Sequence, residues 1–198
     1  MKKMHVKIRF TESILGTCPN NKDIYLDFIA SKAPAPSEDV NKEAEMIQED
    51  PEKQMTVFPR TEDGVPFLYD YQIKGFLKGA CGGLRKVAGT ESSKIKAFKK
   101  EIDLLIFPQP RIIPFKDYKE IGLLQRPLRA STPQGERISL AISEEIPAGA
   151  SIEFDIVLLH DDHEDAVREW LDYGQFSGIG QWRNASHGRF VCEEITVE

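Results

Sequence analysis

Two segments of the sequence concentrate side chains that bind anions. The first runs from residue 74 to residue 100 and carries eight basic residues against one acid, Glu91. Lys74, Lys78 and Arg85 are separated by four and seven residues, so on a helix they share one face and can contact successive phosphates. A solvated helix face explains the same three residues without any ligand.

The second segment, residues 174–190, contains no acid and is rich in glycine. Its glycines allow close backbone approach to a ligand, its two arginines can grip phosphates, and its tryptophan can stack on a base. The alternative is a glycine-rich turn whose aromatic residues pack in the core. This combination is typical of a single-stranded nucleic-acid site, and the candidate binding residues of the segment are Gly178, Gly180, Trp182, Arg183, His187, Gly188 and Arg189.

Other residue patterns indicate familiar nucleotide, metal or thiol sites only weakly. The glycine-rich segment is predicted to follow a helix and enter a strand, the reverse of a dinucleotide fingerprint, and it lacks the ending of a P-loop. The run from His160 to Asp165 mixes imidazole and carboxylate groups, but capping at a helix start accounts for its acids. Cys81 is predicted to pack inside a helix. We therefore assign no metal ligand and no cofactor.

The composition restricts any site for a polyanion to a local basic patch. The chain has 198 residues with 32 acids and 26 bases, a net charge of −6, which excludes a uniformly basic protein that coats nucleic acid. No apolar run approaches the roughly 18 residues of a membrane span. The three cysteines are far apart and odd in number, as expected of reduced thiols. We expect a soluble, cytoplasmic protein that does not contact membranes.

The spacing of apolar residues predicts both helices and strands, and these elements must position the two segments. Two helices are predicted, one from Asp70 to about Val87 and one that starts at Asp161 or Asp162. They are embedded among strands that often follow one another, which favours an α+β fold over a doubly wound parallel sheet. A ferredoxin-like β-α-β-β-α-β core with insertions, in a single domain over residues 1–198, is the simplest match. The predicted strands are 5–10, 56–58, 66–69, 103–107, 112–115, 124–130, 136–141, 151–159 and 189–197.

One insertion stands apart in composition. Residues 31–53 contain three prolines and seven acids, which indicates a surface excursion with one short helix. An acidic projection of this kind can contact the basic segment 74–100 of a neighbouring copy, which would assemble the protein head to tail. A disordered acidic excursion is the alternative.

Several of these residues resemble a known family when taken in order. Ile73-Lys74-Gly75-Phe76-Leu77-Lys78 at a helix start is similar to the helix motif of the RAMP superfamily, the repeat-associated RNA-binding proteins of CRISPR effector complexes. The turn 146–150 leading into Phe154, followed by a helix and by the glycine-rich segment 174–190, resembles the C-terminal half of that family. The resemblance covers residues from about Val65 to Val197.

The resemblance implies a fold and a set of partners. It implies an RNA-recognition fold of the ferredoxin-like type, closest to the backbone subunit that polymerises along guide RNA in antiviral ribonucleoproteins. The expected partners are single-stranded RNA and copies of the chain itself or other effector subunits. In such subunits the helix motif and the glycine-rich loop lie near the RNA backbone, which carries over to Lys74, Lys78, Arg183 and Arg189.

Three alternatives remain open at this stage. A stand-alone or virus-encoded relative keeps the fold without joining an effector complex. A structural or interaction protein uses the fold only for self-assembly or to mimic a subunit, which the acidic net charge favours. Some members of the superfamily cleave RNA, and an endoribonuclease would rely on His187 as general acid or base, or on Asp23 in the region after the first strand. We assign no catalytic residue.

Overall fold

The computed structural model describes residues 1–21, 55–132 and 135–198. Asp23 and the acidic insertion 31–53 lie outside the described residues, so the predictions made for them stay predictions. Within the described part, no helix is both long and apolar enough to cross a membrane.

The main sheet has four antiparallel strands in the spatial order β11-β1-β10-β6. A helix-containing connection joins β1 to β6, and another joins β10 to β11, so each pair of parallel strands is split by a third strand. This is the ferredoxin-like arrangement, and the predicted α+β fold is confirmed. The strands are β1 (Lys2–Phe10), β6 (Ile106–Gln109), β10 (Ser151–Leu158) and β11 (Phe190–Val197).

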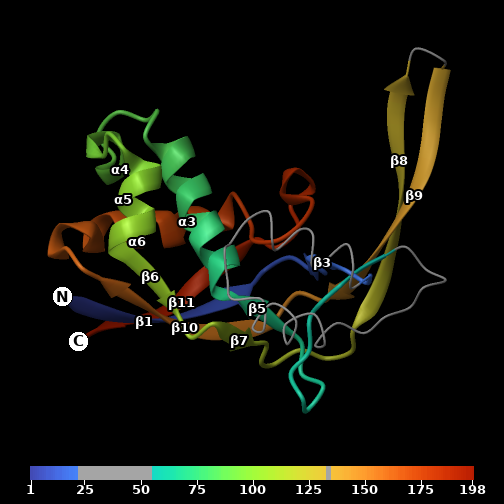
Figure 1. Cartoon of the computed structure of the whole chain (residues 1–198), viewed down its shortest axis with the longest axis horizontal. Helices are drawn as coiled ribbons and strands as arrows, with labels where there is room; N and C mark the ends of the chain where they lie inside the picture. The colour runs from blue at the N-terminus through green and yellow to red at the C-terminus, as the bar shows by residue number, and fades with distance from the viewer. Residues whose placement is uncertain (22–54, 133–134) are drawn as a thin grey trace.

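Helices α3 (Asp70–Leu84) and α6 (Glu164–Asp172) cover one face of this sheet (Figure 1). Each helix repeats apolar residues at helical spacing, and these residues are buried against the inward side chains of β1 and β10. Trp170 of α6 is fully buried, and its Nε1 donates to Ser92 Oγ at 2.7 Å. The core is therefore a helix layer packed on one side of a sheet.

The region 91–107 differs from the sequence prediction. Residues 103–107 were expected to form a strand, but α5 (Phe98–Leu105) extends through Leu105 and β6 starts only at Ile106. The continuous apolar run 104–107 fits a strand as well as a helix, and the run alone does not show where one changes to the other. The short helix α4 (Glu91–Lys94) was also missed; Glu169 of α6 accepts from the backbone N–H groups of Glu91 and Ser92 at its start.

A second sheet carries a long hairpin that extends away from the helix-covered body (Figure 1). The hairpin was predicted, but its strands β8 (Gly122–Thr132) and β9 (Gly135–Ile146) are longer than expected. Along the edge of β9 opposite β8, its base also pairs with two short strands, β2 (Ile14–Leu15) and β4 (Met55–Val57). The remaining short strands are β3 (Cys18–Pro19), β5 (Phe67–Tyr69) and β7 (Ile112–Pro114).

On the face of the main sheet opposite the helices, side chains of opposite charge form ion pairs. Lys3 and His5 of β1 both contact Asp155 of β10 at 2.8 Å, and Arg9 forms a two-point ion pair with Glu193 of β11. Domains that read RNA on this type of sheet stack bases on exposed aromatic rings. Because charges that neutralise one another occupy this face, a nucleic-acid site has to be sought elsewhere.

The carboxylates of this charged face make folding stability depend on pH. The hydrogen bond from Arg9 holds the pKa of Glu193 below its ordinary value, and the hydrogen bond from Lys116 does the same for Glu153. A depressed folded-state pKa adds stability above the unfolded value, and that stability is lost as the pH falls through the folded value. We expect the free energy of unfolding in urea to fall between about pH 5 and pH 3, and to fall less in Glu193→Gln. Glu120→Gln, at an exposed glutamate, is the matched control; an equal pH dependence in both variants would contradict the assignment.

Candidate nucleic-acid interface

The glycine-rich segment folds back on itself through its glycines. Ile179 N–H donates to the carbonyl of Gly188 at 2.9 Å, and Gly188 N–H donates to Ser13 in the connection after β1 at 2.8 Å. A Cβ on Gly178 would lie 2.3 Å from the carbonyl carbon of Gly188. The space that these two glycines leave is thus filled by the loop's own backbone, which fixes the loop against β1.

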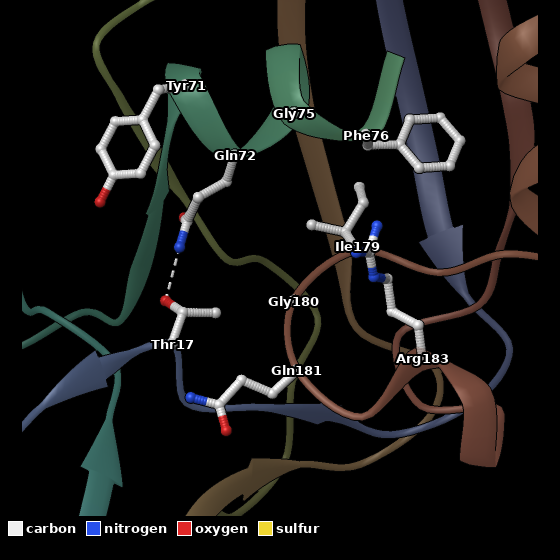
Figure 2. A pocket seen from close by; sticks show the side chains of 9 residues that line it. All are labelled: Thr17, Tyr71, Gln72, Gly75, Phe76, Ile179, Gly180, Gln181 and Arg183. Atoms are coloured by element: carbon white, nitrogen blue, oxygen red, sulfur yellow. Dashed lines mark hydrogen bonds between the residues drawn. The ribbon is translucent and has the colours of Figure 1, made fainter. Parts of the chain in front are cut away.

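Gln72 fixes the start of α3 beside this loop. Its Oε1 accepts the Tyr69 backbone N–H at 2.9 Å, and its Nε2 donates to Thr17 Oγ1 at 2.6 Å (Figure 2). Asp70, which the sequence predicted as the helix cap, is the first helical residue and instead pairs with Arg111. The beginning of α3 is therefore tied to the connection between β2 and β3, facing the loop.

A cleft of about 250 Å³ separates the start of α3 from the glycine-rich segment (Figure 2). Gly75 of α3 and Gly180 of the loop leave it open, and none of its described lining residues is acidic. Amide, hydroxyl and guanidinium groups supply hydrogen bonds beside an apolar floor. The lining residues are Thr17, Tyr71, Gln72, Gly75, Phe76, Ile179, Gly180, Gln181 and Arg183.

Arg183 is the charged residue of this cleft. Its Nη1 lies 3.6 Å from the position that a Cβ on Gly79 would take, so the absence of a side chain at Gly79 lets the guanidinium approach α3. Arg183 remains exposed, and Figure 2 shows its guanidinium beside Ile179. An exposed guanidinium next to hydrogen-bonding side chains can bind a phosphate or carboxylate group.

The predicted basic face of α3 points elsewhere. Lys74 Nζ donates to the backbone oxygen of Asp103 at 2.9 Å, and Lys78 forms an ion pair with the Asp103 carboxylate. Arg85 lies over the Phe98 ring, 5.1 Å from its centroid. Burial lowers the pKa of Lys74. These three cations contact α5, whereas α3 meets the glycine-rich segment through its glycines, so the two predicted segments do not converge through Lys74, Lys78 and Arg85.

The remaining candidate residues of the loop have partners of their own. Trp182 is 41% exposed and stacks on His187 with ring centroids 5.3 Å apart. Nδ1 of His187 lies 3.0 Å from Ser13 Oγ, as expected of a histidine that anchors a loop. Arg189 is half-buried, and its Nε is buried without a hydrogen-bond partner. The structure brings Gly180 and Arg183 into the cleft and leaves the other candidates around it.

Residues that the sequence analysis did not single out complete the site. Thr17, Tyr71, Gln72 and Gln181 line the cleft. Tyr71 and Gln72 directly precede the helix motif, a signal that was available but not used, whereas Thr17 is distant in sequence and joins only through the fold. Arg126 of β8 was also missed, although its guanidinium lies over the Trp182 ring.

Among the described residues, no group of three or more His, Cys, Asp or Glu side chains is placed to hold a metal ion. In the run His160–Asp165, His160 Nδ1 accepts the Asp162 backbone N–H at 3.4 Å, and Glu164 pairs with Lys2 and Arg168. The acids lie in the first turns of a short 3-10 helix and of α6, as predicted, but the side chain that caps the 3-10 helix is that of His160 and α6 has no side-chain cap.

Chains of two solved structures share the fold of this protein. A chain of the structure described as "Cryo-EM structure of the Type III-B Cmr-beta bound to cognate target RNA" aligns with 99% of this chain at a TM-score of 0.57 and 13% identity. The present chain spans only 60% of that one. A chain of "Type IV-B CRISPR Complex" aligns with 98% of this chain and 90% of its own length, at a TM-score of 0.50 and 13% identity. At these identities, the comparison establishes a shared fold.

Comparisons of sequence add nothing to this likeness. No protein-family model matches the chain, and no curated protein matches it. The resemblance to CRISPR complex subunits thus rests on the fold and on the motifs quoted above.

The close approach of Gly188 predicts a large cost for any side chain there. Gly188 has a φ of +71°, and its Cβ would lie 1.9 Å from the carbonyl oxygen of Ile179. Gly64 has a φ of +80° with open space around it, so it isolates the backbone strain alone. We expect Gly188→Ala to lower the free energy of unfolding in urea by about 3 kcal/mol and Gly64→Ala by about 1 kcal/mol. Equal losses would show that the loop backbone is not held this closely.

Proposed function

We propose that the protein is an RNA-binding subunit of a CRISPR-type ribonucleoprotein that holds single-stranded RNA by its backbone. The observation that carries the proposal is the cleft between α3 and the glycine-rich segment, where Arg183 is exposed among hydrogen-bonding side chains and the described lining contains no acid. The fold shared with chains of two CRISPR complexes, one of them bound to target RNA, supports it.

The chemistry of the cleft fits a phosphodiester backbone better than a base code. A guanidinium supplies charge and paired donors, and the amides of Gln72 and Gln181 can donate to phosphate or ribose oxygens. Phosphate contacts carry no sequence information, so binding is expected to be weakly selective and to weaken as salt rises. The role is binding, and we assign no catalytic residue to the cleft.

Charge reversal at Arg183 tests this function. We expect Arg183→Glu to weaken binding of fluorescein-labelled oligouridine by about tenfold or more, because one charge-assisted contact is replaced by repulsion. Lys119→Glu makes the same charge change at an exposed residue outside the cleft and should bind within about twofold of the original protein. Fluorescence polarisation measures the affinities, and thermal unfolding checks that both variants are folded. Unchanged binding in Arg183→Glu would overturn the proposed site.

A second candidate function is protein assembly without nucleic acid. Two observations favour it: Lys78 is paired with the Asp103 carboxylate and Lys74 donates to the Asp103 carbonyl, so both cations are engaged within the chain, and the net charge is −6. Light scattering of the purified protein, together with its absorbance ratio at 260 and 280 nm, separates the two functions. Co-purified RNA in a large assembly supports the RNA-binding subunit, whereas a defined oligomer free of nucleic acid, which also fails to bind oligouridine, supports assembly alone.

A further inference from the structure

Arg126 is a buried cation with no anionic partner among the residues that the structure describes. It lies on β8 opposite Ala141 of β9 and is only 9% exposed. Within that part of the chain, its buried Nε and Nη1 have no hydrogen-bond acceptor. Withdrawal from water without a counter-charge disfavours the charged form, and burial lowers the pKa of Arg126. A charge kept in this way at a cost in stability needs a reason beyond packing.

Trp182 covers this guanidinium from the glycine-rich segment. The Cζ atom of Arg126 lies 4.3 Å from the Trp182 ring centroid, a cation–π contact that replaces only part of the lost hydration. The contact joins the base of the hairpin to the loop that borders the cleft. Arg183, the next residue after Trp182, lines that cleft. The covered guanidinium is therefore adjacent along the chain to the exposed one.

The backbone at Trp182 is strained in the covered arrangement. Trp182 has a φ of +53° and a ψ of +37°, a left-handed conformation that is rare for a bulky residue. Ser186, four residues on, is also left-handed at a φ of +74°. These two residues bracket a short 3-10 helix over Arg183–Ala185. A movement of Trp182 that uncovers Arg126 and returns its backbone to a right-handed conformation would thus release this strain.

We infer that Arg126 and Trp182 form a closed phosphate site that opens when single-stranded RNA binds. Trp182 leaves both the Arg126 guanidinium and the His187 ring and stacks on a base, and Arg126 donates its unpaired N–H groups to the adjacent phosphate. The inference rests on the proposed function and adds a residue on the hairpin to it. The exchange supplies both groups with better partners, since charge-assisted bonds to phosphate replace a cation–π contact and a base replaces part of the exposed ring surface.

The site explains why RNA would contact the hairpin as well as the cleft. Arg183 lies in the 3-10 helix of the glycine-rich segment and Arg126 on strand β8, and Trp182, which precedes Arg183 in the chain, contacts Arg126. A strand of RNA held at Arg183 meets Trp182 as the next side chain along the loop. Binding at one arginine then makes the other available, which favours extended RNA over a single nucleotide.

Arg126→Met tests the phosphate contact, because methionine keeps the apolar stem and removes the charge. We expect binding of oligouridine to weaken by about tenfold, and the slope of log affinity against log salt to fall by about 0.7. The same substitution should leave thermal stability unchanged or raise it, because it removes an unpaired buried charge. Lys119→Met, at an exposed lysine elsewhere, removes the same charge and should leave the affinity within about twofold.

Intrinsic fluorescence follows the movement of Trp182. The protein has two tryptophans, of which Trp170 is fully buried, and Trp182→Phe supplies its background emission. We expect saturating oligouridine to quench the original protein and Arg126→Met, and to leave Trp182→Phe unchanged. Binding without quenching would overturn the opening of the site.

Two further outcomes separate the inference from the function on which it rests. If Arg183→Glu loses affinity while Arg126→Met keeps both its affinity and its salt slope, the hairpin site is wrong and the cleft remains. If the original protein does not bind oligouridine at any salt concentration, the proposed function and the inference are both wrong. Reduced affinity in Arg126→Met together with a large loss of thermal stability would identify Arg126 as a structural residue and overturn its role in binding.

Discussion

The pairing of β1 with β10 on one side and β11 on the other is the constraint from which the rest of the structure follows. The inward side chains of β1 are fully or almost fully buried beneath the two helices. The chain then leaves β1 toward Ser13, whose backbone oxygen accepts the Gly188 N–H and whose hydroxyl lies 3.0 Å from His187 Nδ1. The part of the loop around Gly188 is therefore positioned by the same strand that organises the core.

Residue types that attract attention as ligand contacts here have structural uses as well. Gly178 and Gly188 allow the loop to close on itself, and Lys74 and Lys78 tie α3 to α5. Of the candidate cations that do not have such a structural role, Arg183 is the one that is exposed and also lines the cleft. Fewer side chains are thus available to bind a ligand than the composition of the two segments indicates. The proposed nucleic-acid interface depends on a few cations placed by glycines, in agreement with the acidic net charge.

The sequence predicted those parts of the fold that local periodicity decides. Polar and apolar residues alternate in β1 and β10, and apolar residues recur at helical spacing in α3 and α6. The order of these elements matches a ferredoxin-like fold. Helix α5 was missed, and its last residues were predicted as part of a strand because an apolar run fits either a helix or a strand. The contact of Thr17 with Gln72 was missed because it joins separate segments. Arg126 gave no signal of its own, since a lone arginine in a strand acquires meaning only from the ring that covers it.

The position of β1 also sets the order in which the protein can fold. Its neighbours in the sheet come from residues 151–158 and 190–197, and Lys3 exchanges two backbone hydrogen bonds with Glu198 at 2.9 and 3.0 Å. During synthesis both edges of β1 stay unpaired until residues 151–158 have emerged from the ribosome. Helix α3 is made before β10 and β11, so it lacks its complete sheet until those strands follow. Such distant pairing makes folding slow and leaves an apolar strand open to chaperones while translation proceeds.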